Sequence, residues 1–275
     1  MTSMIQEKIK NPNRTKNLQK LGLYSFLIIA ITWVGVIRIG FNPRRVDGTW
    51  ENFLFIVSKF FPDDYFEESG AINWALDVAV DSFIETIQIG LLGSIVACII
   101  AYPICLMSSK LTAPNKIIYG SMRTVLNVLR TLPELFWVII ATTALGFGSF
   151  AGLISVIIFI TFIIYKLFAE TLDALDPGPL EAVRATGATY FTSLIHSVVK
   201  EVNPVYFALC IYMIELSIRI SAVIGLVGAG GIGQLINVER VYFHWDNVSS
   251  IVLAMTLLIV ALEILSTNIR TRILR

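Results

Sequence analysis

The sequence contains few charged residues for its length. Asp, Glu, Lys and Arg make up 15% of the 275 residues, whereas a typical soluble domain carries roughly 25%. Hydrophobic residues make up 56%, and the mean hydropathy is +0.75. The apolar residues are concentrated in long blocks, which excludes an ordinary soluble domain and indicates a polytopic membrane protein. The length is sufficient for about six spans joined by short loops.

Residues that bind metals or carry out covalent chemistry are scarce. The three cysteines, Cys98, Cys105 and Cys210, lie in apolar runs without metal-ligand spacing and are interpreted as packing residues. The two histidines, His196 and His244, have no carboxylate or cysteine at ligand spacing, which favours surface or packing roles. No nucleophile is placed with a base in a catalytic pattern. We therefore expect no catalytic residue, no metal site and no cofactor.

The sequence also lacks a G-x-x-x-x-G-K-[ST] motif, so any ATP hydrolysis is expected on another chain. The stretch 225–233 does match G-x-G-x-x-G, the pattern of dinucleotide sites. Its context argues against that function, because the preceding residues continue a hydrophobic run and no parallel sheet can be assembled around it. We interpret Gly228, Gly230, Gly231 and Gly233 as a helix break buried in protein or lining a cavity.

The distribution of charge predicts the orientation in the membrane. Residues 1–20 contain five basic residues and one acidic residue, so a cytoplasmic tail is predicted. Residues 40–81 contain eight acidic and three basic residues, which suits an extracytoplasmic loop over about 40–78. The C-terminal tail is basic, with Arg270, Arg272 and Arg275. Both termini are therefore expected in the cytoplasm.

Six spans are predicted from the uncharged runs. The first lacks a small-residue cleavage site and is interpreted as a retained span. The run 135–165 has 31 uncharged residues and breaks at 145–152. Because each half is too short to cross a core of about 30 Å, the third span is expected to reach back through Pro133. The predicted spans are 21–39, 86–109, 117–145, 150–169, 204–227 and 248–265, the last five forming a core over 79–270.

One predicted span contains two charges of opposite sign. Glu215 and Arg219 are four residues apart and lie on one helical face. An isolated charge in a span costs about 2.5–3.5 kcal/mol on insertion scales, so mutual pairing is expected. The pair either locks the helix bundle or leaves Arg219 available to an anion on a translocation pathway, and the two interpretations are compatible.

The segment 180–204 is the longest moderately polar stretch between hydrophobic runs in the second half of the chain. Pro179 and Glu181 suit the first turn of a helix, and Gly187 suits its end. An amphipathic segment follows over 189–200. We therefore predict a short helix, a turn and a second helix along the cytoplasmic surface, within a loop over 170–203.

These residues resemble the "EAA" loop of ABC-importer permeases. Glu181-Ala182, followed by Gly187, matches that motif within one residue of spacing. The stretches that resemble the permease subunit of phosphonate importers are KLFAE (166–170), DPGPLEAVRATGA (176–188), TLPELF (131–136), the Glu215–Arg219 pair and GLVGAGGIG (225–233). The resemblance covers roughly 80–270 and implies an all-α, type I importer-permease fold with six transmembrane helices.

The resemblance also implies a function and partners. Glu181, Ala182, Arg184 and Gly187 would couple the pore to an ABC ATPase. A second permease chain, in a homodimer, and an extracytoplasmic phosphonate-binding protein would complete the importer. The chain would reside in the lipid bilayer of the bacterial cytoplasmic membrane, with no nucleic-acid partner. Its cargo would be phosphonates or related small oxyanions such as phosphite.

Two alternatives remain open at this point. The first is an ABC permease for another small solute, such as a sulfonate, methionine or a thiamine precursor. The second is a secondary transporter driven by an ion gradient, a class that often has paired broken helices. The break at 225–233 has only a weak sequence counterpart at 145–152. An integral-membrane enzyme is disfavoured because the sequence contains no nucleophile arrangement or metal cluster.

Overall fold

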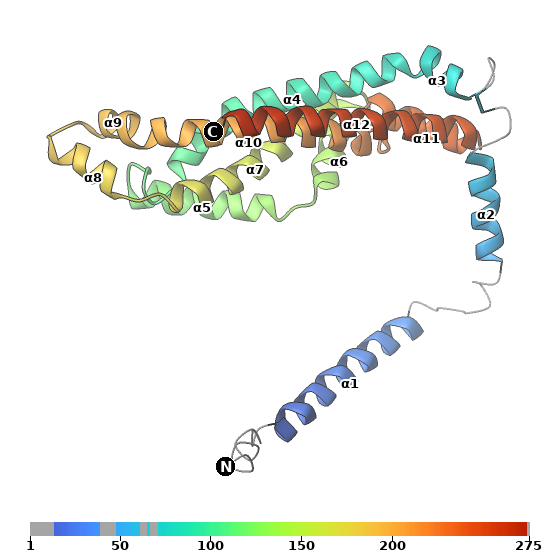
Figure 1. Cartoon of the computed structure of the whole chain (residues 1–275), viewed down its shortest axis with the longest axis horizontal. Helices are drawn as coiled ribbons and strands as arrows, with labels where there is room; N and C mark the ends of the chain where they lie inside the picture. The colour runs from blue at the N-terminus through green and yellow to red at the C-terminus, as the bar shows by residue number, and fades with distance from the viewer. Residues whose placement is uncertain (1–13, 39–47, 61–64, 67–70, 274–275) are drawn as a thin grey trace, which may run out of the picture. The chain divides into compact units, whose positions relative to one another are not determined.

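The structure is a computed structural model that describes residues 14–38, 48–60, 65–66 and 71–273. Every regular element in these ranges is a helix (Figure 1). The chain divides into two compact units, residues 1–58 and 59–275, which we describe separately.

The first unit contains α1 (Arg14–Arg38) and most of α2 (Thr49–Phe60). Within α1, the stretch Lys20–Arg38 is long and apolar enough to cross a membrane, and none of its residues is buried inside the chain. The predicted first span, 21–39, therefore coincides with this helix up to its last described residue. The predicted basic tail lies mostly outside the described residues, as do parts of the acidic loop 40–78.

The second unit is a helical bundle. Its helices are α3 (Ala71–Val78), α4 (Val80–Met107), α5 (Lys116–Arg130), α6 (Glu134–Leu145), α7 (Ser149–Asp173), α8 (Gly178–Ala185), α9 (Tyr190–Ser193), a π-helical segment (Leu194–Val199), α10 (Lys200–Gly225), α11 (Gly231–Val241) and α12 (Trp245–Ile273). Helices α4, α7, α10 and α12 lie alongside one another (Figure 1).

Small residues bring the central helices of the bundle close together. A Cβ atom on Gly90 of α4 would lie 2.7 Å from the Cα atom of Ile218 on α10. A Cβ atom on Gly93 would lie 2.6 Å from Cγ1 of Val156 on α7. Close backbone approach of this kind is how helices associate in a membrane, where lipid tails compete with apolar side chains. Helix α4 therefore packs directly against both α7 and α10.

Side-chain hydrogen bonds show the directions of these helices. Ser149, at the start of α7, donates to Glu85 near the start of α4, and Ser109, just after α4, donates to Asp173 at the end of α7. Helices α4 and α7 are therefore parallel. Ser217 on α10 donates to the carbonyl of Gly90, whereas Asn203 at the opposite end of α10 accepts from Tyr102, so α10 is antiparallel to α4.

Four of the five spans predicted for the core 79–270 overlap a single long apolar helix. Helices α4, α7 and α12 and the continuous helical stretch Tyr190–Gly225 are each long and apolar enough to cross a membrane. The helix of the fifth span begins before Pro204, the first residue of the predicted span, and runs through this proline. The π-helical segment lies directly before α10, and such local adjustments compensate for the hydrogen bonds that proline removes.

The predicted third span corresponds to two helices that are long and apolar enough to cross a membrane only when taken together. The stretch 117–145 is divided into α5 and α6, which are bent by 87° relative to each other. Pro133 has an extended conformation, with φ −61° and ψ 151°, and caps α6. Proline also disfavours the helical conformation in the preceding residue, Leu132, so the helix is interrupted before α6 begins.

Candidate functional site

The predicted helix–turn–helix of the segment 180–204, which we call the coupling segment, is present. Helix α8 begins after Pro177, with Pro179 one position later in the helix than expected. It is followed by Gly187, whose φ of +81° favours glycine. Thr189 then caps the next helix by accepting a hydrogen bond from the backbone of Thr192. The sequence therefore specified the local structure of this segment through its proline, glycine and cap.

Helix α8 is anchored on one side and exposed on the other. Leu180 is buried in the main core cluster. Glu181, Ala182 and Arg184 are exposed, as is Gly187 after the helix. The Arg184 guanidinium lies 5.9 Å from the ring centre of Tyr190. The Glu181 carboxylate has no side-chain hydrogen bond or ion pair within the described part of the chain.

The coupling segment is bound to the turn between α4 and α5. The Tyr190 hydroxyl at the start of α9 donates to the carbonyl of Thr112 in that turn. The same turn is attached to the end of α7, because Ser109 Oγ and the Lys110 backbone N–H donate to Asp173 Oδ1 at 2.9 and 3.0 Å. Helix α9 is therefore connected to α4 and α7 through this turn, and the helix it begins continues into α10.

Glu215 and Arg219 form a charge cluster with a third residue, Arg270. Arg219 Nη2 lies 3.0 Å from Glu215 Oε1, and Arg270 Nη2 lies 3.9 Å from Glu215 Oε2. The Glu215 side chain is 6% exposed and that of Arg219 is 45% exposed. Sequence spacing indicated the first pair and missed Arg270, which also lies 5.3 Å from the ring centre of Tyr212. Glu215 is thus held from two helices, while Arg219 presents part of its guanidinium to the surroundings.

The glycine-rich stretch forms a tight break between α10 and α11. Gly228, Gly230 and Gly231 have φ of +90°, +81° and +68°, a region that other residues adopt with strain. A Cβ atom on Gly233 would overlap the carbonyl oxygen of Ala222. The break is therefore packed against protein backbone.

This break packs against the second one, between α6 and α7. The backbone N–H of Gly148 donates to the carbonyl of Gly228 at 2.9 Å. Helix α4 holds both breaks, because Glu85 accepts from Ser149 while Thr86 Oγ1 accepts from the backbone of Ile232 at 2.7 Å. The contact of Glu85 with Ser149 depends on the parallel packing of α4 and α7, which the position of Glu85 in the sequence does not reveal.

No metal centre is found in the described ranges, since no group of three or more His, Cys, Asp and Glu residues has a suitable arrangement. His244 is nevertheless not a lone histidine, which corrects the sequence interpretation. Its Nδ1 lies 2.8 Å from Glu239 Oε2, and the same oxygen accepts from Asn247 Nδ2 at 2.9 Å. These three residues connect the end of α11 to the start of α12.

Comparison with known proteins decides the family. Residues 91–275 match the family described as "Binding-protein-dependent transport system inner membrane component". The chain belongs to this family. It is therefore a membrane permease subunit of an ABC importer and not an enzyme, and its ATPase is a separate chain. A gradient-driven secondary transporter is excluded by the same finding.

Curated relatives and solved structures agree with this assignment. The phosphite transport system permease protein PtxC of Stutzerimonas stutzeri is 31% identical over 249 residues, covering 90% of this chain and 86% of that protein. The phosphate-import permease protein PhnE of Mycolicibacterium smegmatis is 32% identical over 187 residues, covering 68% of this chain and 35% of that protein.

Two solved transporters have the same fold. A chain of the MetNI methionine ABC transporter, in an inward-facing conformation, gives a TM-score of 0.63 at 18% identity, covering 73% of this chain and 98% of that one. A chain of an amino acid ABC transporter gives 0.64 at 15% identity, covering 77% and 100%. At these identities the comparison shows the fold alone, and it confirms the all-α importer-permease architecture.

Proposed function

We propose that this chain is the permease subunit of an ATP-driven importer for small phosphorus oxyanions, either phosphonates or phosphite. The relatives named for phosphite and phosphate import support this class of cargo. The observation that carries the proposal is the partly exposed guanidinium of Arg219, which pairs with Glu215 in a helix apolar enough to span a membrane. A planar guanidinium can donate two parallel hydrogen bonds to an oxyanion, which suits a phosphonate group.

The charge cluster suits transient binding of an anion. The buried carboxylate of Glu215 offsets the charge of Arg219 between transport events, so the empty pathway does not contain an isolated charge. Arg270 approaches the other oxygen of the same carboxylate and limits its movement. A passing oxyanion would compete with Glu215 for Arg219, which gives binding that is strong enough to select anions and weak enough to release them.

The exposed face of α8 is the proposed contact with the ATPase. Glu181, Ala182, Arg184 and Gly187 would enter a groove on that subunit, while buried Leu180 fixes the helix to the bundle. Because Glu181 has no partner among the described residues, its carboxylate is available to a positive group of the ATPase. Closure of the ATPases around ATP would then pull on α8 and, through α9 and the helix that continues it, on α10.

The complete importer would contain further chains. Two copies of this permease would form the pore as a homodimer above two ATPase subunits. A separate binding protein would deliver the ligand to the extracytoplasmic face. The first span and the C-terminal basic residues would place both termini in the cytoplasm of a bacterial cell.

Ligand-stimulated ATP hydrolysis by the reconstituted complex tests the proposed cargo. The assay would contain the permease, its ATPase, the cognate binding protein and one ligand at a time. The panel would comprise aminoethylphosphonate, an alkylphosphonate, phosphite, phosphate, a sulfonate and methionine. We expect stimulation by a phosphonate or phosphite. Stimulation by the sulfonate or methionine alone would refute the proposed cargo and retain the permease assignment.

A further inference from the structure

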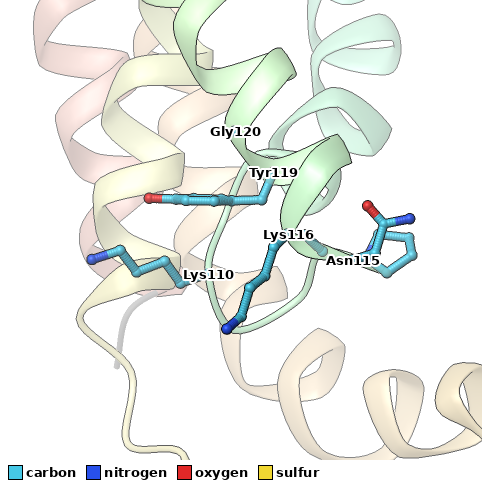
Figure 2. A pocket seen from close by; sticks show the side chains of 7 residues that line it. Lys110, Asn115, Lys116, Tyr119 and Gly120 are labelled. Carbon is cyan, nitrogen blue, oxygen red and sulfur yellow. The ribbon is translucent and has the colours of Figure 1, made fainter.

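A cavity of about 670 Å³ lies between the α4–α5 turn and the first turns of α5. It is lined by Lys110, Ala113, Pro114, Asn115, Lys116, Tyr119 and Gly120, which we call the lysine pocket. Figure 2 shows the Tyr119 ring and the Lys110 side chain extending in the same direction, with Lys116 pointing away from α5.

The lysine pocket has a positive charge that the described residues do not neutralise. Lys110 and Lys116 are exposed, and neither forms an ion pair within the described part of the chain. The adjacent acid, Asp173, is already engaged by Arg123 and by two donors from the turn. The start of α5 adds the positive end of a helix dipole. A negatively charged group is therefore the complementary ligand.

The position of the lysine pocket places it beyond the lipid core. The 24 uncharged residues from Thr86 to Ser109 immediately precede Lys110. As a helix they would extend about 36 Å, which exceeds a hydrocarbon core of about 30 Å. The turn that carries Lys110 is also hydrogen bonded to Tyr190 of the coupling segment. The pocket is thus on the same side of the bundle as α8 and next to the proposed ATPase contact.

We propose that the lysine pocket binds an acidic segment of the ATPase, as a second docking contact beside α8. The inference rests on the proposed coupling function. It assigns α4 and α5 a direct connection to the ATPase, whereas α8 connects the ATPase to α10 through α9. Two separated contacts would fix the orientation of the permease on the ATPase, because a single helix in a groove still allows rotation about its axis.

Charge reversal in the assembled complex tests this docking contact. The double variant Lys110→Glu with Lys116→Glu is compared with Lys110→Arg with Lys116→Arg, and with Arg272→Glu, which reverses an exposed basic residue on α12, outside both the pocket and the segment 180–204. We expect the Glu double variant to weaken ATPase binding about ten-fold or more at low salt. The Arg double variant and Arg272→Glu should bind as the wild type does. Unchanged ATPase affinity in the Glu double variant would overturn the proposal.

Crosslinking provides a readout that does not depend on affinity. Ile117 is 80% exposed and follows Lys116 directly, so a photoreactive residue at this position should form a covalent adduct with the ATPase. Adducts with phospholipid alone would identify a lipid-facing surface and overturn the proposal.

Failure of the lysine-pocket proposal can be distinguished from failure of the proposed coupling through α8. If Glu181→Arg releases the ATPase and the lysine variants do not, the docking pocket is refuted and the coupling function stands. If neither change affects ATPase binding, the coupling function itself is refuted.

Discussion

Arg219 and Glu215 share one ion pair but differ in their exposure, and the proposed pathway role of Arg219 rests on this difference. A pair that only locked helices together would be expected to bury both groups. Here the carboxylate is buried and approached by a second arginine, whereas the Arg219 side chain remains 45% exposed. Arg219, the exposed member of the pair, is therefore the residue proposed to bind the cargo.

The substitution Arg219→Lys tests this assignment. It retains the positive charge and removes the planar fork that donates two parallel hydrogen bonds. We expect uptake of the transported oxyanion to fall about ten-fold, with normal amounts of folded permease in the membrane, because one charge-assisted hydrogen bond is worth about 1.5–3 kcal/mol. The measurement is initial uptake rate against ligand concentration in proteoliposomes. Kinetics equal to those of the wild type would remove Arg219 from the pathway.

The substitution Glu215→Gln tests the other half of the pair. It leaves Arg219 and Arg270 without their shared carboxylate, so we expect a loss of stability of about 1–3 kcal/mol. Thermal unfolding of the purified permease in detergent provides the measurement. Glu263→Gln is the matched control, because Glu263 is exposed on α12. An equal effect of the two substitutions would contradict the role of Glu215.

At the residue scale, the sequence could predict contacts within one helix but not contacts between helices. Glu215 and Arg219 were identifiable because a spacing of four places them on one face. Arg270 reaches Glu215 only because α10 and α12 pack together, and the sequence pattern contains no measure of that packing. The Ser149–Glu85 contact was missed for the same reason.

The two helix breaks are the elements that distinguish this bundle from a set of straight spans. The turns at 146–148 and 226–230 meet through the Gly148–Gly228 hydrogen bond, and α4 contacts both. The sequence indicated each break separately through its glycines. It could not show that the breaks form one structure, because they are about 80 residues apart in the chain.

The substitution Gly230→Ala tests this joint structure. The new Cβ would lie 2.8 Å from Glu85 Oε1 and 2.9 Å from the backbone nitrogen of Ser149, at a φ of +81°. With its ψ of −175°, Gly230 has a backbone conformation that essentially only glycine adopts, which costs another residue about 1–3 kcal/mol, and the crowding adds to it. We expect a lower unfolding temperature and reduced uptake.

Gly120→Ala is the control for that substitution, because Gly120 is in helix α5 and a Cβ there would meet nothing within 4 Å. Alanine is favoured over glycine in a helix, so this variant should be as stable as the wild type or more so. If both alanine variants have the same stability, the glycine break is not packed as described.

The third span shows what an argument from length leaves out. The core thickness required a long crossing segment, and the prediction therefore extended the span back through Pro133. Because this proline restricts Leu132, the segment is bent and forms two helices at 87°. In the coupling segment the local signals and the fold agree, which is why α8, the turn at Gly187 and the cap at Thr189 were predictable.

At the scale of the whole molecule, the chain is one part of a larger machine. It belongs to a family of importer permeases, so its ATPase and a second permease chain lie outside it. Composition predicted a polytopic membrane protein and motif order predicted the family. In the proposed importer the cargo is selected by a separate binding protein, so the identity of the cargo could be reached only through resemblance.

The substitution Glu181→Arg tests the connection between the permease and its ATPase. It reverses the charge of an exposed side chain that has no partner among the described residues, so the fold should be retained. We expect at least about a ten-fold loss of ATP-driven uptake, either through release of the ATPase or through hydrolysis that no longer responds to ligand. Thermal unfolding of the permease alone serves as the control and should be unchanged.

The most direct test of ATP-driven import coupled through α8 is simultaneous measurement of aminoethylphosphonate uptake and ATP hydrolysis in proteoliposomes. The vesicles would contain the permease, its ATPase and the binding protein, with either wild-type permease or Glu181→Arg. We predict uptake that requires ATP in the wild type and is lost in Glu181→Arg. Equal ATP-driven uptake by the two permeases, or wild-type uptake that continues without ATP, would contradict the account.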